Sequence, residues 1–318
     1  MAINDTTQPL LPVLSERERA ALVTLLADED PAVYRVIRAR ILACGPDACG
    51  WLRGYRLNSD PRLRRRVTEI VEHFGRCEAD NRFLGFCLRQ GEDLDLEEGC
   101  WLLARTRYPE INVTAYRALL DEFADPLREK ISLSDQPQAV IATINERIFG
   151  ELGFVGDEQN YYHPENSHLN RVLDRRSGNP LLMCTVYLGA ARRLGLPIAG
   201  IGLPGHFLCR YQTPVRELYI DAFGGGRILT KADCVKYLQQ TGYEFHEAFL
   251  VPASPRRMLL RMCSNLHQIY TRLDDGETAA AMHGYVIALS KSRAPTSSAG
   301  RWWSACSLTA RLPRAPSS

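Results

Sequence analysis

The sequence predicts an α+β protein in which helical segments flank one mixed domain. Two stretches, residues 15–130 and 255–290, carry apolar residues at helical spacing. Between them, residues 198–223 contain three short β-like runs, which are separated by a Pro-Gly turn and by a polar turn and are followed by a run of glycines. These observations predict an antiparallel sheet in the central domain, with helical segments before and after it in the sequence.

The N-terminal helical stretch has repeated start signals. Asp30-Pro31 and Asp60-Pro61 each place a good N-cap before a proline at the first helical position, and a plausible partner helix precedes each pair. Helix pairs at a regular spacing are typical of stacked repeats, in which each repeat buries the apolar face of its neighbour. We therefore expect a HEAT-like helical domain over residues 15–130, after an N-terminal segment at residues 1–14.

The central domain, expected over residues 136–251, contains one sharply bounded helix. Asn179 is a good N-cap, and Pro180 suits the first helical position. Gly195 followed by Pro197 ends the helix, and apolar residues recur at helical spacing between these signals.

Two strand-like runs after this helix carry a histidine and an aspartate. His206 starts the second run and Asp221 lies near the end of the third. An antiparallel hairpin that places Leu208 opposite Asp221 would bring His206 and Asp221 to one face. A carboxylate beside an imidazole orients the ring and raises its basicity, as in a nucleophile–His–Asp triad.

The segments around these residues resemble the SirB-type family of transglutaminase-like proteins, which are associated with tetratricopeptide repeats. The resemblance extends over about residues 136–251 and implies a papain/transglutaminase-like core, in which a helix packs on an antiparallel sheet. The matching motifs occur in the family's order: Glu151-Leu-Gly-Phe154, Asn166-Ser-His-Leu-Asn170, Gly178-Asn-Pro180, Pro204-Gly-His-Phe207 and Ile220-Asp-Ala-Phe-Gly-Gly-Gly226.

The resemblance also predicts where a catalytic cysteine would stand. In transglutaminase-like enzymes a cysteine opens the core helix, and Pro180 occupies that position here. Cys184 lies one turn further along, which displaces it by roughly 5 Å along the helix axis. His206 and Asp221 are therefore interpreted as a remnant catalytic pair without its nucleophile, and Cys184 as a core residue.

Polar residues before and at the start of the central helix are candidates for ligand binding or for capping. The segment that precedes the helix is too polar for an ordinary loop, and its amides and guanidinium groups are hydrogen-bond donors. The candidate binding residues are Asn166, Asn170, Arg175, Arg176 and Asn179.

The C-terminal part divides into a helical pair and a tail. Residues 255–290 contain two helical runs split by Asp274-Asp275-Gly276, which resemble one tetratricopeptide hairpin. After Glu277 the chain has no acidic residue, and residues 291–318 are rich in Ser, Arg, Pro and Ala. We expect this tail to be disordered or an aberrant version of the family's terminus.

Composition narrows the function classes. A formal net charge of +2 gives no electrostatic reason to expect nucleic acid or a membrane surface as a partner. We expect no signal peptide, because residues 1–12 lack a basic segment followed by an apolar run, and no membrane span, because no apolar run is long enough. Its ten cysteines include no Cys-x-x-Cys pair, so we expect a cytoplasmic protein with reduced thiols, no metal site and no cofactor.

Two classes of function remain. The favoured hypothesis is a non-catalytic transglutaminase-like module that binds a protein or peptide partner. The alternative is an enzyme: either a cysteine-type hydrolase or acyltransferase using Cys184, His206 and Asp221, or a hydrolase in which His206 and Asp221 activate water.

Overall fold

A computed structural model describes residues 14–291 of the chain except residues 90, 93, 133, 134, 214 and 215. Apart from Leu14 and Lys291, the predicted N-terminal segment and the predicted tail lie outside the described residues. The chain divides into two compact units, residues 1–79 and 80–318, and the division falls within α4 (Pro61–Arg89). The stretch predicted as one helical domain, residues 15–130, thus contributes to both units.

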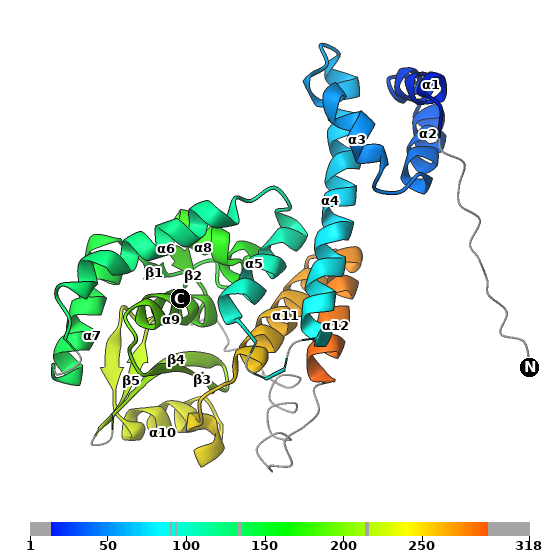
Figure 1. Ribbon diagram of the computed structural model, residues 1–318. Helices are drawn as coiled ribbons and strands as arrows, with labels where there is room; N and C mark the ends of the chain where they lie inside the picture. Colours follow the sequence, from blue (N-terminus) through cyan, green and yellow to red (C-terminus); the bar gives the residue numbers. More distant parts are fainter. Residues whose placement is uncertain (1–13, 90, 93, 133–134, 214–215, 292–318) are drawn as a thin grey trace, which may run out of the picture. The chain divides into compact units, whose positions relative to one another are not determined.

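The first unit is helical, as the sequence predicts. It contains α1 (Glu16–Leu26), α2 (Pro31–Ala43), α3 (Ala48–Leu52), a 3₁₀ turn at Arg53–Leu57 and the first part of α4 (Figure 1). Asp30 caps α2 by accepting a hydrogen bond from the Ala32 amide, which confirms the first Asp-Pro start signal. The core of this unit includes Leu26, Ile41 and Ile70, which are fully buried.

The second unit contains a four-stranded antiparallel sheet with a helix on each face. The strand order is β3 (Ile198–Leu203), β4 (His206–Gln212), β5 (Glu217–Asp221) and β6 (Arg227–Leu229). On one face α9 (Pro180–Arg193) packs against β3 and β4, and α10 (Lys231–Gln240) lies on the other face (Figure 1). The mixed helix-and-sheet architecture agrees with the predicted α+β class.

The second unit also contains a small second sheet, three single turns and four further helices in its central part. A two-stranded parallel sheet pairs β1 (Val155–Gly156) with β2 (Ser177–Gly178). Single turns occur at Glu146–Glu151, Pro164–Ser167 and Glu247–Leu250. The other helices of the central part are α5 (Leu96–Arg107), α6 (Val113–Arg128), α7 (Pro137–Asn145) and α8 (Leu169–Arg175).

The central helix α9 is the best-buried element of the second unit. Every residue from Pro180 to Tyr187 is buried, as expected for a helix that is covered on all sides. Asn179 caps its start: the Leu182 amide donates a 2.9 Å hydrogen bond to Asn179 Oδ1. Gly195 ends it in the left-handed conformation, with φ 66°. The helix begins and ends where its signals predict.

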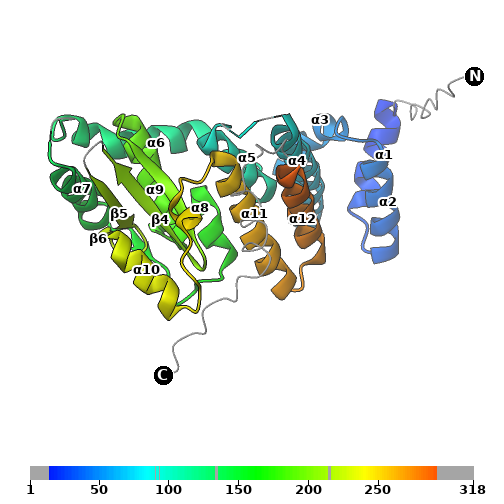
Figure 2. The same ribbon diagram turned by 90° about the horizontal axis from the view of Figure 1, so that it is seen from below.

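A helical hairpin completes the unit. It consists of α11 (Pro255–Arg272) and α12 (Gly276–Ser290), and α11 packs against α12 and against α5 (Figure 2). The predicted pair of helices over residues 255–290 is therefore present. The close approach of α5 requires a glycine, because a Cβ atom at Gly99 would lie 2.3 Å from Leu259 Cδ1.

Candidate functional site

The predicted histidine and aspartate meet in the structure. His206 Nε2 lies 2.9 Å from Asp221 Oδ1, and both side chains are largely buried. The hairpin register explains the contact. Cys209 pairs with Ile220 across β4 and β5, so the same register places Leu208 opposite Asp221, as predicted. Residues two apart along a strand share a face, and His206 therefore joins Asp221 on the side where its ring contacts Tyr237 of α10.

Asp221 is held as a carboxylate by several donors. Its Oδ1 also accepts the Gly224 amide at 3.0 Å, and its Oδ2 accepts Arg227 Nη2 at 3.2 Å. Burial alone would raise the pKa of Asp221, but His206, the Gly224 amide and Arg227 together hold this pKa below its ordinary value. The aspartate can therefore orient the imidazole while it stays ionised at neutral pH.

The start of α9 lies beside this pair. Asn179 Nδ2 donates to Ser167 Oγ at 2.8 Å while its Oδ1 caps the helix. The Met183 amide donates to the Asn179 carbonyl at 2.9 Å. The amides of Leu182 and Met183 are thus already bonded, and Pro180 has no amide hydrogen to offer.

A cleft opens beside His206 and the start of α9. Its empty volume, which includes space open to solvent, is about 1080 Å³. The β3–β4 turn at Pro204-Gly205 lines it, as do Asn179, Pro180 and Leu181. Aromatic residues form part of its wall: Tyr161, Tyr162, Phe207 and Phe249.

One wall of the cleft was not foreseen from the sequence. Residues of α11 line it: Arg261, Ser264, Asn265, Gln268, Ile269 and Arg272. Their spacing of three, four and seven residues defines one face of a helix, and this signal is present in the sequence. That this stripe faces the start of α9 is a result of tertiary packing, which the sequence spacing does not determine.

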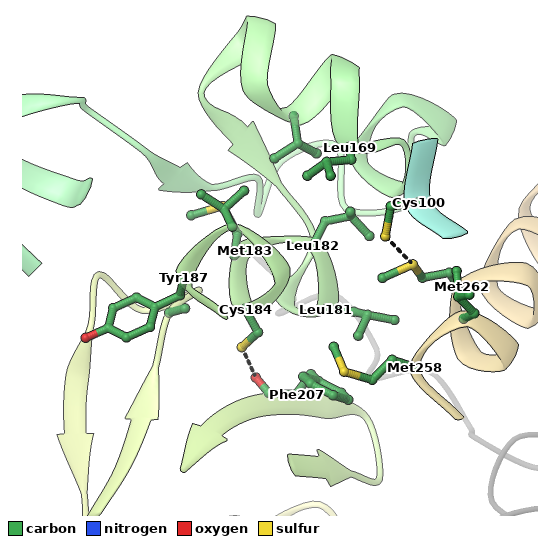
Figure 3. Packing of buried hydrophobic residues seen from close by; sticks show 14 of the residues in the cluster. Cys100, Leu169, Leu181, Leu182, Met183, Cys184, Tyr187, Phe207, Met258 and Met262 are labelled. Carbon is green, nitrogen blue, oxygen red and sulfur yellow. Dashed lines mark hydrogen bonds between the residues drawn. The ribbon is translucent and has the colours of Figure 1, made fainter. Parts of the chain in front are cut away.

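Cys184 lies away from the cleft. Its thiol is fully buried and donates to the Phe207 carbonyl at 3.4 Å, inside the core between α9 and β4 (Figure 3). Phe207 and Cys209 point toward α9, whereas His206 points to the opposite face of β4. Burial, with a further contribution from Cys209, raises the pKa of the Cys184 thiol well above its ordinary value. The structure does not bring this thiol to His206.

Asn166 and Arg175 belong to a largely buried polar network outside the cleft lining. Arg175 Nη2 donates to Asp157 Oδ2 at 3.1 Å, and Arg175 Nη1 donates to Asn166 Oδ1 at 3.0 Å. Asn166 Nδ2 donates to Asp157 Oδ2 and to the Asn160 carbonyl. Burial opposes ionisation of Asp157, but the Asn160 amide, Asn166 and Arg175 hold its pKa below the ordinary value. This network ties the segment between β1 and α8 to the end of α8.

Arg176 and Asn170 are also placed outside the cleft lining. Arg176 has a left-handed backbone, with φ 55°, and its guanidinium lies 4.5 Å from the Phe123 ring centre and 5.0 Å from that of Phe154. Asn170 is buried, and its Oδ1 has no hydrogen-bond partner among the described residues. Of the five predicted binding residues, Asn179 alone lines the cleft.

The described residues contain no cluster of three or more His, Cys, Asp or Glu side chains that could hold a metal ion. None of the helices in the described part of the chain is long and apolar enough to cross a membrane.

Comparison with known proteins places this unit in context. The family model of the transglutaminase-like superfamily matches residues 114–264. A UPF0162 protein of Xylella fastidiosa (strain Temecula1) is 33% identical over 204 residues, which cover 62% of this chain and 73% of the relative. A UPF0162 protein of Pseudomonas aeruginosa is 31% identical over 202 residues, which cover 62% of this chain and 71% of the relative.

A eukaryotic protein shares a shorter segment. F-box only protein 21 of Mus musculus is 35% identical over 135 residues, which cover 40% of this chain but 21% of that protein. No solved structure matches the chain.

Proposed function

The chain belongs to the UPF0162 family and carries a transglutaminase-like domain, and we propose that it is a non-catalytic module that binds a protein or peptide partner in the cleft beside His206. The observation that carries the proposal is the start of α9. Pro180, which has no nucleophilic side chain, stands at the position where the resemblance expects a catalytic cysteine, yet the cleft around it persists.

The lining of the cleft supports a peptide as the ligand. Tyrosine and phenylalanine rings provide apolar contact area, and amide and hydroxyl groups of α11 provide hydrogen-bonding capacity. Such a combination of an apolar wall with a few polar groups is typical of binding sites. The α11–α12 hairpin, which we interpret as tetratricopeptide-like, contributes one wall.

A blocking substitution tests the proposal. Wild-type protein would be screened against a random-sequence peptide library, and the affinities of the selected peptides would be measured for two variants. Ser264→Trp fills the cleft, because Ser264 lines it. Ser290→Trp is the matched control, since Ser290 is exposed on α12 and its hydroxyl makes the same hydrogen bond to a carbonyl four residues earlier.

We expect Ser264→Trp to weaken the affinity for the selected peptides by at least about ten-fold and Ser290→Trp to leave this affinity unchanged. Equal binding by both variants would place the peptides elsewhere on the protein and overturn the proposal. Mass spectrometry of the peptides after long incubation should show neither cleavage nor transfer.

A second candidate function is hydrolysis through an activated water. It is favoured by the orientation of His206: Nε2 is bonded to Asp221, the ring lines the cleft, and the other ring nitrogen has no hydrogen-bond partner in the described part of the chain. Against it, the Leu182 amide at the start of α9 is already bonded to Asn179, which reduces the donors available to an oxyanion. Peptide cleavage that His206→Ala abolishes would establish this candidate instead. The alternative that uses Cys184 gains no support, because burial raises the pKa of its thiol and keeps the thiol protonated.

A further inference from the structure

Within the described part of the chain, the cleft is lined by basic side chains and by no acidic one. The side chains of Arg261, Arg272 and His206 line it, and no Asp or Glu is among the lining residues. The start of α9 adds the positive end of a helix dipole on the same side. The carboxylate nearest to His206, that of Asp221, is already bonded to His206, the Gly224 amide and Arg227. A ligand with a negative charge therefore fits the cleft better than a cationic one.

The two arginines of α11 differ in how they are held. Arg261 Nη1 donates to the Leu203 carbonyl at 2.9 Å, and its guanidinium lies 5.6 Å from the Phe207 ring centre. Arg261 therefore ties α11 to the β3–β4 turn. Arg272 is exposed, its guanidinium lies 5.0 Å from the Tyr162 ring centre, and no carboxylate pairs with it among the described residues. The contact with the Tyr162 ring and a hydrogen bond to the Tyr162 side chain orient this guanidinium, and its remaining N–H groups can bind a carboxylate.

Two amide side chains lie between these arginines on the same helix face. Asn265 and Gln268 line the cleft, and neither side chain has a hydrogen-bond partner in the described part of the chain. An amide side chain offers one acceptor and two donors, which match the N–H and C=O groups of a peptide backbone. From Arg261 to Arg272 the stripe measures roughly 16 Å at the helical rise, about the length of five extended residues.

We propose that the cleft takes an extended peptide segment that carries a carboxylate, with Arg272 as its specificity-determining residue. Asn265 and Gln268 hold the main chain of the segment, and Arg272 binds the carboxylate over Tyr162. This inference rests on the proposed function and names the chemical class of its ligand. The carboxylate can be an Asp or Glu side chain or a free C-terminus, since both present the same two oxygens.

Synthetic peptides distinguish these sources. Peptides selected by the wild-type protein would be made in four forms: with Asp or Glu or with Asn or Gln in the sequence, and each with a free or an amidated C-terminus. Affinities would be measured for the full-length wild type, for Arg272→Gln and for Lys236→Gln. Lys236→Gln is the matched control because it removes the same charge from an exposed position on α10 that does not line the cleft.

The carboxylate that binds is either a side chain or the C-terminus. For that one of the two, we expect the acid form of the peptide to bind the wild type about ten-fold or more tightly than the amide form, as for a charge-assisted bidentate contact. Arg272→Gln should remove this preference, whereas Lys236→Gln should keep it. Equal wild-type affinity for the acid and amide forms would overturn this inference while the proposed function stands, provided that Ser264→Trp still weakens binding and Ser290→Trp does not. Loss of the preference in both variants would also overturn it, because the effect would then come from net charge. If Ser264→Trp has no effect, the proposed function itself fails.

Discussion

Asp221 Oδ1 lies 2.9 Å from His206 Nε2, and the same oxygen accepts the Gly224 amide at 3.0 Å. Replacing Asp221 with alanine would leave the largely buried His206 ring without its partner, and would also release the more exposed Gly224 amide. An unsatisfied buried donor costs about 1–3 kcal/mol, so we expect Asp221→Ala to lower the free energy of unfolding by about 2 kcal/mol.

Urea denaturation of the variant would measure this loss, with Arg227→Ala as the comparison. The side chain of Arg227 is 67% exposed and reaches the other oxygen of Asp221. Exposed ion pairs contribute about 0–1 kcal/mol, so its removal should change the unfolding free energy little. Similar losses for both variants would show that the aspartate is not the structural centre of this hairpin.

The environment of Cys184 predicts a slow reaction with thiol reagents. Full burial raises the pKa of its thiol well above the ordinary value, so little thiolate is present at neutral pH. Iodoacetamide should label Cys184 at the rate at which the protein unfolds. Cys77, which is exposed, serves as an internal control and should react rapidly. Peptide mass spectrometry over a time course would follow both residues, and fast labelling of Cys184 in the native protein would restore the cysteine-enzyme alternative.

Much of the site's framework was predictable because local rules govern it. Asn179, Pro180 and Gly195 determine the ends of α9, and each acts within one helical turn of the end that it defines. If His206 and Asp221 share one face, paired residue numbers across β4 and β5 must have an odd sum, and the observed pairing of Cys209 with Ile220 satisfies this condition.

The α11 wall of the cleft could not be predicted in the same way. The sequence predicts the apolar side of that helix, and its residues are buried as expected: Met258, Leu259, Met262, Leu266, Ile269 and Tyr270. The polar side has the spacing of an ordinary solvent-exposed face. Its position opposite Asn179 depends on how α11 packs in the folded unit, which no periodicity encodes. Arg175 and Arg176 show a related limit: the left-handed backbone at Arg176 sends two neighbouring guanidinium groups to different surroundings.

The buried ring of His168 predicts a loss of stability in mild acid. The ring is 1% exposed, neither of its nitrogens has a hydrogen-bond partner among the described residues, and it contacts the ring of Tyr108. Burial, with a smaller effect from Arg107, lowers the pKa of His168 to about 3. The unfolded chain, with an ordinary histidine pKa of about 6.5, binds the proton more readily. Stability is therefore fully present above that value and falls as the pH decreases from about 6.5 toward 3.

Linkage predicts that protonation of His168 alone lowers the free energy of unfolding by roughly 2 kcal/mol between pH 7 and pH 5. Urea denaturation at both pH values would measure the loss for the wild type and for His168→Phe, which cannot titrate. The pH dependence should be smaller in His168→Phe by about that amount. His163→Phe is the control, since His163 is exposed, and it should retain the wild-type dependence. An unchanged slope in His168→Phe would mean that the folded protein protonates His168 without difficulty.

The glycines after β5 allow steric contact to be separated from backbone strain. Gly225 and Gly226 both have left-handed backbones, with φ 71° and 81°. A Cβ atom at Gly225 would meet nothing within 4 Å, whereas one at Gly226 would lie 2.3 Å from Asn145 Oδ1. The side chain of Asn145 also donates to the Gly226 carbonyl at 2.7 Å, and this bond ties α7 to the turn that follows Asp221.

Gly225→Ala should therefore cost about 1 kcal/mol of unfolding free energy, which is the strain of a left-handed alanine. Gly226→Ala should cost about 2–4 kcal/mol, because the strain is joined by displacement of Asn145 and loss of its hydrogen bond. Parallel urea titrations of the two variants would give the difference. Equal costs would show that Asn145 moves freely and that the link from α7 does not fix the turn. A larger cost at Gly226 would show that Asn145, which lies outside the hairpin, helps to hold the turn that follows Asp221 in place.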